Sequence, residues 1–328
     1  MSPRAKAVAA KTTARPSVLA ARRAQPLATT NGAGSGAPRL EVRKTYKLYI
    51  GGAFPRTESG RSYEIHGARG QLLANACRGT RKDIRDAVRA ARTALPGWAG
   101  KTGFNRSQIL YRIAELMEGR RDQFIGEVMA AEGLGRQRAT RLTDAAIDRW
   151  VWYAGWADKF SQVSGSVNPV NGSYFNFSVP EPSGVVGVIA PETSSLLGLV
   201  SRLAPVIVSG NCAVVLASET RPLPAVTLTE VLATSDVPGG VVNLITGLRR
   251  ELVLHLTGHM DVNALDAYGL DPAQGVAVEE LATENVKRLV RPPLGGADAV
   301  DWLSANAQSP YLIGEFVETK TVWHPIGS

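Results

Sequence analysis

Apolar runs alternate with segments of helical spacing from Gly184 onward, and this alternation limits the fold more than any other feature of the chain. The first run, 185–190, is continuous, as is typical of a strand buried on both faces; further runs lie at 213–216 and 241–245, and a short fourth strand is expected at 262–267. Helices are predicted between them, over 196–208, 225–234 and 249–256. A spacing of about 25 residues predicts βαβ units and a parallel sheet. We therefore expect a doubly wound, Rossmann-like α/β domain over 183–290, with its ligand crevice at the carboxyl ends of the strands.

The part before this domain, residues 46–162, is predicted to be mainly helical. Apolar residues recur at helical spacing over 82–98, 105–133 (one long helix or a pair) and 141–160. Pro96 and Gly97 are expected to end the first helix. Lys47–Phe54 is typical of a strand, a Gly-Gly turn and a second strand. Three tryptophans are expected to pack in the core rather than to form a ligand cage: Trp150, Trp152 and Trp156.

Residues 163–182 have the pattern of a β-hairpin. Tyr174–Val179 alternates and is rich in aromatic and β-branched residues, and Asn171-Gly172 before it is typical of a tight turn. We therefore expect a small β arm between the helical part and the parallel sheet.

Positive charge is concentrated at the amino terminus. The 328-residue chain has a formal net charge of +8, but residues 1–40 contain seven basic residues and no acidic one, which leaves +1 for the remainder. Residues 1–45 have few large apolar side chains to offset the entropy of ordering, so we expect a disordered basic tail. Four roles stay open for it: an organelle transit peptide, an arm that binds polyanions, a docking peptide and a solvated extension. Nucleic-acid binding is not expected except through this tail.

Composition bears on compartment and cofactor type. No run approaches the roughly 18 apolar residues that a membrane span needs, so no membrane association is expected. Two cysteines, Cys77 and Cys212, are too few for a disulfide framework and indicate a reducing compartment. We expect a cytoplasmic protein, or one of an organelle matrix if residues 1–40 are a transit peptide. The four histidines show no metal-ligand spacing with acidic or cysteine partners, and His255 and His259, four apart at helical spacing, lack a third ligand, so no metal site is expected.

Five motifs together resemble the aldehyde dehydrogenase superfamily. They are Lys47–Gly52, Glu181–Pro191, Leu203–Pro205 with Gly210-Asn211, Val237–Gly247 and Glu318–Trp323. The resemblance runs from about Tyr46 to Leu270 and again from about Asp301 to Ile326. It implies a cofactor-type domain at 183–290. It also implies an oligomerisation sheet, built from 163–182 and from a carboxyl-terminal strand within 291–328.

The resemblance also implies that the catalytic domain is missing. In the family, the nucleophilic cysteine lies in a separate domain. Here Glu284–Val290, which resembles the helix and strand that lead into that domain, is followed after a short piece, 291–300, by the carboxyl-terminal segment. Neither Cys77 nor Cys212 matches the nucleophile motif, and both are expected to be small buried side chains.

Two further catalytic positions are altered relative to the family. Pro292 stands at the position of the general-base glutamate, and Thr193 stands at that of the oxyanion asparagine. Threonine is a shorter donor, and Glu192 beside it places a carboxylate where it would repel an anionic intermediate. We therefore expect no catalytic residue in this chain.

Three residues are candidates for cofactor binding, because the resemblance places them in the family's cofactor motifs: Glu219, Gly247 and Gly269. Two other cofactor contacts are lost, since Leu216 stands at the ribose-binding lysine and Leu270 at the serine that faces the pyrophosphate. A leucine side chain cannot donate a hydrogen bond. NAD or NADP is therefore expected to bind weakly or not at all.

The leading interpretation is a pseudoenzyme, a non-catalytic homologue that associates through its oligomerisation strands. Its expected partner is a full-length aldehyde dehydrogenase subunit, with a homo-oligomer as the other option. Three alternatives stay open. They are an active NAD(P)-dependent aldehyde dehydrogenase with displaced residues, a nucleotide-binding module without redox chemistry, and a decayed gene product without function.

Overall fold

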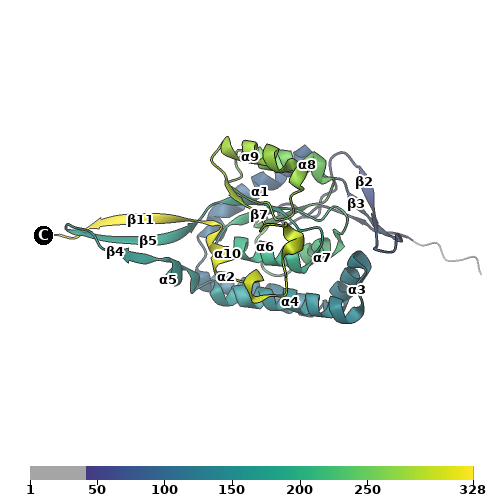
Figure 1. The fold of residues 1–328 in the computed structure, drawn as a ribbon, viewed down its shortest axis with the longest axis horizontal. Coiled ribbons are helices and arrows are strands. Elements are labelled where there is room, and N and C mark those ends of the chain that lie inside the picture. The colour runs from purple at the N-terminus through teal and green to yellow at the C-terminus, as the bar shows by residue number, and fades with distance from the viewer. Residues whose placement is uncertain (1–41, 328) are drawn as a thin grey trace, which may run out of the picture. The chain divides into compact units, whose positions relative to one another are not determined.

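Five parallel strands form a central sheet in the spatial order β10-β9-β6-β7-β8 (Figure 1). They are β6 (Val185–Ile189), β7 (Cys212–Leu216), β8 (Val242–Ile245), β9 (Ala264–Asp266) and β10 (Arg288–Val290). The computed structural model describes residues 42–327. Every residue of β6 and β7 is buried, which explains why both strands are continuous apolar runs.

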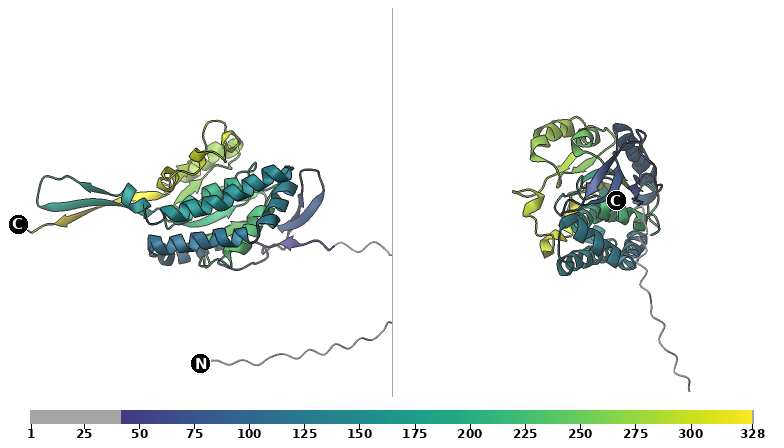
Figure 2. Two further views of the ribbon diagram at one scale, coloured as in Figure 1. Left: turned by 90° about the horizontal axis from the view of Figure 1, so that it is seen from below. Right: turned by 90° about the vertical axis from the view of Figure 1, so that its right-hand side faces the viewer.

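Helices cover both faces of this sheet, so the predicted doubly wound fold is confirmed. One face is covered by α1 (Arg81–Ala99), α8 (Arg249–Thr257) and α9 (Gly275–Thr283), the other by α6 (Leu197–Val208) and α7 (Leu223–Leu232). A further helical layer packs over α6 and α7 (Figure 2): α2 (Gly103–Glu118), α3 (Arg121–Glu132) and α4 (Arg136–Trp156). Helix α6 is consequently buried along its whole length, as its mostly apolar sequence requires.

A second sheet precedes the helices, in the order β1-β3-β2. Its strands are β1 (Thr45–Tyr46), β2 (Ser62–His66) and β3 (Leu72–Cys77). The two strands predicted over 47–54 are absent as such. Tyr49 instead bridges to Leu244 at the edge of the central sheet, and Ile50 bridges to Ala53 across the predicted Gly-Gly turn.

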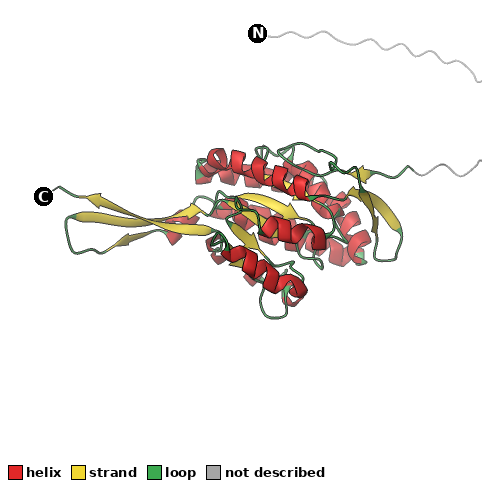
Figure 3. Cartoon of the chain, turned by 90° about the horizontal axis from the view of Figure 1, so that it is seen from above, coloured by secondary structure: helices red, strands yellow, loops and turns green. Residues whose placement is uncertain are grey.

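The third sheet, which we call the arm, has the order β11-β5-β4. Its strands are β4 (Ser166–Asn168), β5 (Tyr174–Pro182) and β11 (Val317–Pro325). Strands β4 and β5 are the predicted hairpin, and Gly172 in their turn has a φ of 147°. The arm extends away from the helices around the central sheet (Figure 3), with α5 (Phe160–Ser164) against β5.

Residues 291–316, which we call the link, join β10 to β11. Their regular structure consists of short turns: η2 (Ala297–Ala299), η3 (Ala305–Ala307) and α10 (Tyr311–Gly314). A buried cation holds the end of the link to the sheet, because Arg202 of α6 contacts Asp266 of β9 at 2.6 Å and Glu315 at 2.7 Å. The Arg202 guanidinium also lies 3.8 Å from the ring centroid of Tyr268.

Several predicted boundaries were wrong. Pro96 and Gly97 do not end α1, because the N–H of Gly100 bonds to the Pro96 carbonyl and closes one more turn. Helix α4 begins at Arg136 and not at 141. Of the two alternatives predicted for 105–133, the helix pair is confirmed as α2 and α3. Between β9 and α9 the chain forms a 3-10 helix, η1 (Pro272–Gln274), that leads directly into α9.

Other predictions are borne out or stay open. Trp150 is fully buried, and Trp152 and Trp156 pack against the same core. The tail predicted over 1–45 lies mostly outside the described residues. Residues Arg43–Ser328 form one compact unit, and its predicted division at 163, 183 and 291 stays a prediction.

Candidate functional site

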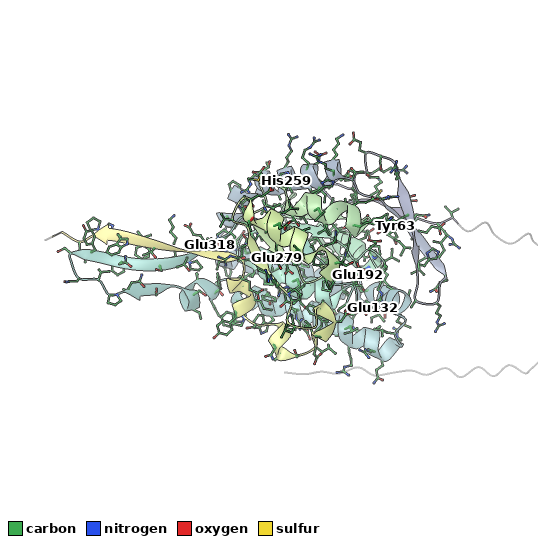
Figure 4. The ribbon with its side chains drawn as sticks, turned by 45° about the horizontal axis from the view of Figure 1, so that its top comes forward. Tyr63, Glu132, Glu192, His259, Glu279 and Glu318 are labelled. Carbon is green, nitrogen blue, oxygen red and sulfur yellow. The ribbon has the colours of Figure 1, made fainter. Side chains whose placement is uncertain are left out.

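A crevice of about 700 Å³ lies at the carboxyl ends of β6, β7 and β9, where a doubly wound sheet presents its ligand site. Its wall includes Glu192 after β6, Glu219 after β7, and Tyr268–Leu270 after β9. Gly295–Asp298 of the link forms another part of the wall. Figure 4 shows Glu192 on the side of the unit that is away from the arm. The crevice is therefore at the edge that the topology predicts.

Glu192 is held by three residues of the loop after β7, which direct four hydrogen bonds to its carboxylate, the longest from the Thr220 N–H at 3.4 Å. Ser218 Oγ and Thr220 Oγ1 donate to its Oε2 at 2.6 and 2.9 Å, and the Glu219 N–H donates to its Oε1 at 2.8 Å. Arg249 Nε lies 2.9 Å from the same Oε1 as an ion pair, since its hydrogen is not directed at that oxygen. Burial raises the pKa of Glu192, but Arg249 and the hydrogen bonds from these three residues outweigh burial and hold it below its ordinary value.

Arg249 extends across the floor of the crevice from the first turn of α8. Its Nη1 donates to the Gly269 carbonyl at 2.7 Å, and its Nη2 donates to the carbonyls of Ala190 and Ala217, the second at 3.3 Å. These carbonyls follow β9, β6 and β7 in turn, so one side chain bonds to the ends of three neighbouring strands. Burial lowers the pKa of Arg249, and the neighbouring carboxylates oppose that effect.

The three residues predicted to bind a cofactor make contacts within the protein itself. Glu219 Oε2 accepts the backbone N–H of Arg249 at 2.7 Å and caps the start of α8. A side chain at Gly247 would lie 2.9 Å from the backbone of the loop before α1. One at Gly269 would lie 2.0 Å from the Ala190 carbonyl oxygen. Both glycines are thus required where backbone segments meet, and their role toward a cofactor stays a prediction.

A dinucleotide does not fit the floor of this crevice as its side chains are arranged. Leu216, at the predicted lysine position, is buried at the end of β7, and Leu270 offers the wall no donor. The strand-end carbonyls and one oxygen of Glu219 already accept hydrogen bonds from Arg249. The wall is also acidic, which disfavours a pyrophosphate, because two arginines face four carboxylates: Arg249 and Arg250 against Glu192, Glu219, Asp271 and Asp298.

The two altered catalytic positions offer neither a base nor a free donor. Thr193 Oγ1 donates to Asp298 Oδ1 at 2.8 Å, so its single proton is directed at a carboxylate of the link. Pro292 lies half-buried at the start of the link and has no ionisable side chain. Glu192, expected to repel an anionic intermediate, is instead neutralised by Arg249.

Both cysteines are buried, as predicted. Cys212 is the first residue of β7, at the opposite end of the strand from the crevice, and burial raises the pKa of its thiol to about 12. Cys77 is the last residue of β3 and is 3% exposed. A protonated and inaccessible thiol does not act as a nucleophile.

Sequence reasoning missed Arg249 as the central residue of the crevice. A basic residue in the first turn of a predicted helix gives no local sign that it turns back across three strands. One signal was available in the sequence: Glu192 follows the first strand of the parallel sheet and Arg249 follows the third. The carboxyl ends of parallel strands lie at one edge of the sheet, so residues that follow them can meet there. Within 42–327, no three His, Cys, Asp or Glu side chains are grouped to hold a metal, and no helix could cross a membrane.

Comparison with known sequences places the chain among aldehyde dehydrogenases. Residues 55–301 match the aldehyde dehydrogenase family. The chain is 33% identical over 264 residues to 2-hydroxymuconic semialdehyde dehydrogenase of Pseudomonas sp. (strain CF600), covering 78% of this chain and 53% of that protein. It is 31% identical over 282 residues to aldehyde dehydrogenase family 2 member B4, mitochondrial, of Arabidopsis thaliana, covering 85% and 49%. The chain spans about half the length of the curated relatives it matches.

Solved structures agree with the sequence comparison. The NAD+ complex of aldehyde dehydrogenase from Bacillus cereus matches with a TM-score of 0.70 and 26% identity, over 75% of this chain and 50% of that one. HpcC from Thermus thermophilus matches with a TM-score of 0.71 and 28% identity, over 75% and 47%. The resemblance expected from the five motifs is therefore confirmed, and the chain belongs to the aldehyde dehydrogenase family.

Proposed function

We propose that this chain is a pseudoenzyme of the aldehyde dehydrogenase family and associates through its arm with a full-length aldehyde dehydrogenase. One observation carries the first half: both cysteines of the chain are buried, and neither lines the crevice. The family reaction needs a thiolate to attack the aldehyde carbonyl, together with an oxyanion donor and a general base. Thr193 and Pro292 do not supply the second and third of these groups.

The link supports the same proposal. Where the resemblance implies a catalytic domain, the chain passes from β10 to β11 through short turns. Arg202 binds Asp266 in the sheet and Glu315 in the link, which anchors the link to the core. The fold is thus closed without the domain that would carry the nucleophile.

The outer edge of β11 supports the proposed association. Among the described residues, β11 has a strand partner on one side only. The carbonyl of Phe316 and the N–H of Ile326 form hydrogen bonds with the chain on the side of β5. In an antiparallel pair, every second residue turns its backbone groups toward the partner strand, and the residues between them turn theirs away. Thr319, Thr321 and Trp323 therefore direct their backbone N–H and C=O groups outward. A partner strand can add to such an edge.

Both faces of the arm expose apolar side chains, and one of them also carries a polar cluster beside Tyr174 and Trp323, which are 47% and 59% exposed. On one face, Asn168 Nδ2 donates to Asn176 Oδ1 at 2.6 Å and to Ser178 Oγ at 2.9 Å. The other face carries side chains that are apolar and only partly covered: Val167, Phe175 and Phe177, of which Val167 is 69% exposed. An exposed apolar face beside an unpaired strand edge is typical of a surface that packs against another protein.

Purification of the tagged chain from native extract tests the association. We expect a full-length aldehyde dehydrogenase, identified by peptide mass, in comparable amount. Thr319→Pro removes one outward N–H and should lower the amount of co-purified dehydrogenase roughly tenfold or more. The matched variant Thr319→Ala keeps that N–H and should leave the amount unchanged. If the chain assembles only with itself, the partner is a second copy of this chain and not a dehydrogenase. If the chain is a stable monomer, neither association takes place.

An assay of the purified protein with a simple aldehyde and NAD+ or NADP+ tests the loss of catalysis. We expect no turnover, because the Cys212 thiol stays protonated and buried. Turnover that disappears in Cys212→Ala would establish the active dehydrogenase instead. Saturable cofactor binding without turnover would favour the nucleotide-binding module.

We also propose the cytoplasm as the compartment, since two free buried cysteines suit a reducing environment. The alternative, an organelle matrix, depends on residues 1–40, which lie outside the described residues. Cell fractionation of the full chain, and of the chain that begins at residue 41, distinguishes the two.

A further inference from the structure

Arg249 contacts the groups that the fold presents to a ligand. In a doubly wound sheet, backbone groups at the carboxyl ends of the strands line the ligand crevice. Here the carbonyls of Ala190, Ala217 and Gly269 accept hydrogen bonds from one guanidinium. Arg249 is 9% exposed, so its side chain belongs to the interior of the crevice floor and not to its rim.

The charge of this guanidinium is balanced within the same crevice. Glu192 lies against Arg249, and Ser218, Glu219 and Thr220 direct four hydrogen bonds to its carboxylate. A buried guanidinium without such a partner would be strongly unfavourable. The two residues therefore form a neutral unit that satisfies the acceptors at the strand ends.

We propose that Arg249 and Glu192 act as a built-in occupant of the crevice floor, a part of the chain that covers the strand ends and excludes adenine nucleotides from them. A nucleotide that reached the strand ends would have to displace the guanidinium. That displacement leaves three carbonyls without their donor, which is costly where they are buried, and it removes the counter-charge of Glu192. This inference is independent of the proposed partner, because it concerns the opposite end of the unit from the arm.

Nucleotide titration of two variants tests the inference. Arg249→Ala empties the floor and keeps the backbone N–H that Glu219 accepts. Arg106→Ala is the matched control, because the half-buried Arg106 guanidinium likewise donates to backbone carbonyls (Val208 at 3.0 Å) but lies outside the crevice. Calorimetry with AMP and with NAD+ should show roughly tenfold or more tighter binding to Arg249→Ala than to the unaltered chain or to Arg106→Ala. Equal binding by the unaltered chain and Arg249→Ala would overturn the inference.

A second measurement covers the case in which Arg249→Ala is too unstable to titrate. Methylguanidinium can enter the space left by the missing side chain and bind the same carbonyls and carboxylate. It should raise the melting temperature of Arg249→Ala in a saturable way, and it should not do so for the unaltered chain, whose own guanidinium fills that space. An identical response of the two proteins would show that the floor is not a guanidinium site and would contradict the inference.

Discussion

The crevice and the arm differ in how their polar backbone groups are satisfied. At the crevice, the carbonyls that end three strands are bonded to Arg249 of the same chain. Along β11, the outward backbone groups of Thr319, Thr321 and Trp323 have no strand partner among the described residues. A region whose acceptors are satisfied internally has little to offer a ligand. A strand edge with unpaired backbone groups can form hydrogen bonds with another chain. The two ends of the unit therefore differ in whether their backbone groups are already bonded.

The largest effect is expected where the link is held to the sheet by a buried charge. Asp266→Asn leaves Arg202, which is 1% exposed, with Glu315 as its remaining carboxylate. We expect a loss of about 3 kcal/mol in the free energy of unfolding, measured by urea denaturation. Glu318→Gln is the control, because its pair with Arg288 is exposed and should contribute less than about 1 kcal/mol. Equal losses in the two variants would show that burial of the Arg202 cluster is not what stabilises the link.

A smaller effect on stability is expected from two carboxylates, Glu192, which is paired with an arginine, and Glu127, which is half-buried with no such pair among the described residues. Burial raises the pKa of Glu127 from 4.5 to about 7, and its Oε2 lacks a hydrogen-bond partner. The protonated Glu127 carboxyl therefore makes its full contribution to the free energy of unfolding below pH 4.5, and that contribution is lost as the pH rises through 7. Glu127→Gln should stabilise the protein by about 2 kcal/mol at about pH 8 and have little effect at about pH 4.

Glu192 should behave with the opposite sign. Its pKa is held below the ordinary 4.5, so its contribution is present above that value and is lost as the pH falls through the lowered pKa. Glu192→Gln should thus cost stability near pH 7, and the cost should vanish in acid. Urea unfolding of both variants across pH measures the two trends, and trends of the same sign would contradict the assignment of Arg249 as the partner of Glu192.

The smallest effect concerns the two sides of β11. Lys320→Pro removes an N–H that faces β5, whereas Thr319→Pro removes one that faces outward. We expect the first variant to speed hydrogen exchange of the β5 amides by about tenfold, the equivalent of one ladder hydrogen bond, and the second to leave it unchanged. The reverse result would mean that the outward and inward positions of the strand are exchanged.

Local patterns predicted much of the fold, and their failures have a common cause. Strands β6, β7 and β8 lie within one or two residues of their predicted bounds, because burial on both faces leaves runs that are apolar except for Asn243 of β8. The hairpin of the arm was predicted from alternation and from Asn171-Gly172. The bridge between Tyr49 and Leu244 was not predicted, because a pairing of residues far apart in the chain leaves no mark on either segment.

The candidate site was predicted less well than the fold. The resemblance identified Glu219, Gly247 and Gly269 from their motifs, but each of them contacts other parts of the protein. Motif positions show where a family places its cofactor, and they do not show which neighbour fills that space in a given chain.

The order of strands and helices, the family and the burial of both cysteines can all be predicted from the printed residues, because burial and motif patterns are local properties. The pairing of Arg249 with Glu192 and the free side of β11 depend on which elements meet in space. Hydrogen bonds and ion pairs form over a few ångströms, so they are determined by the packing that brings distant segments of the chain together.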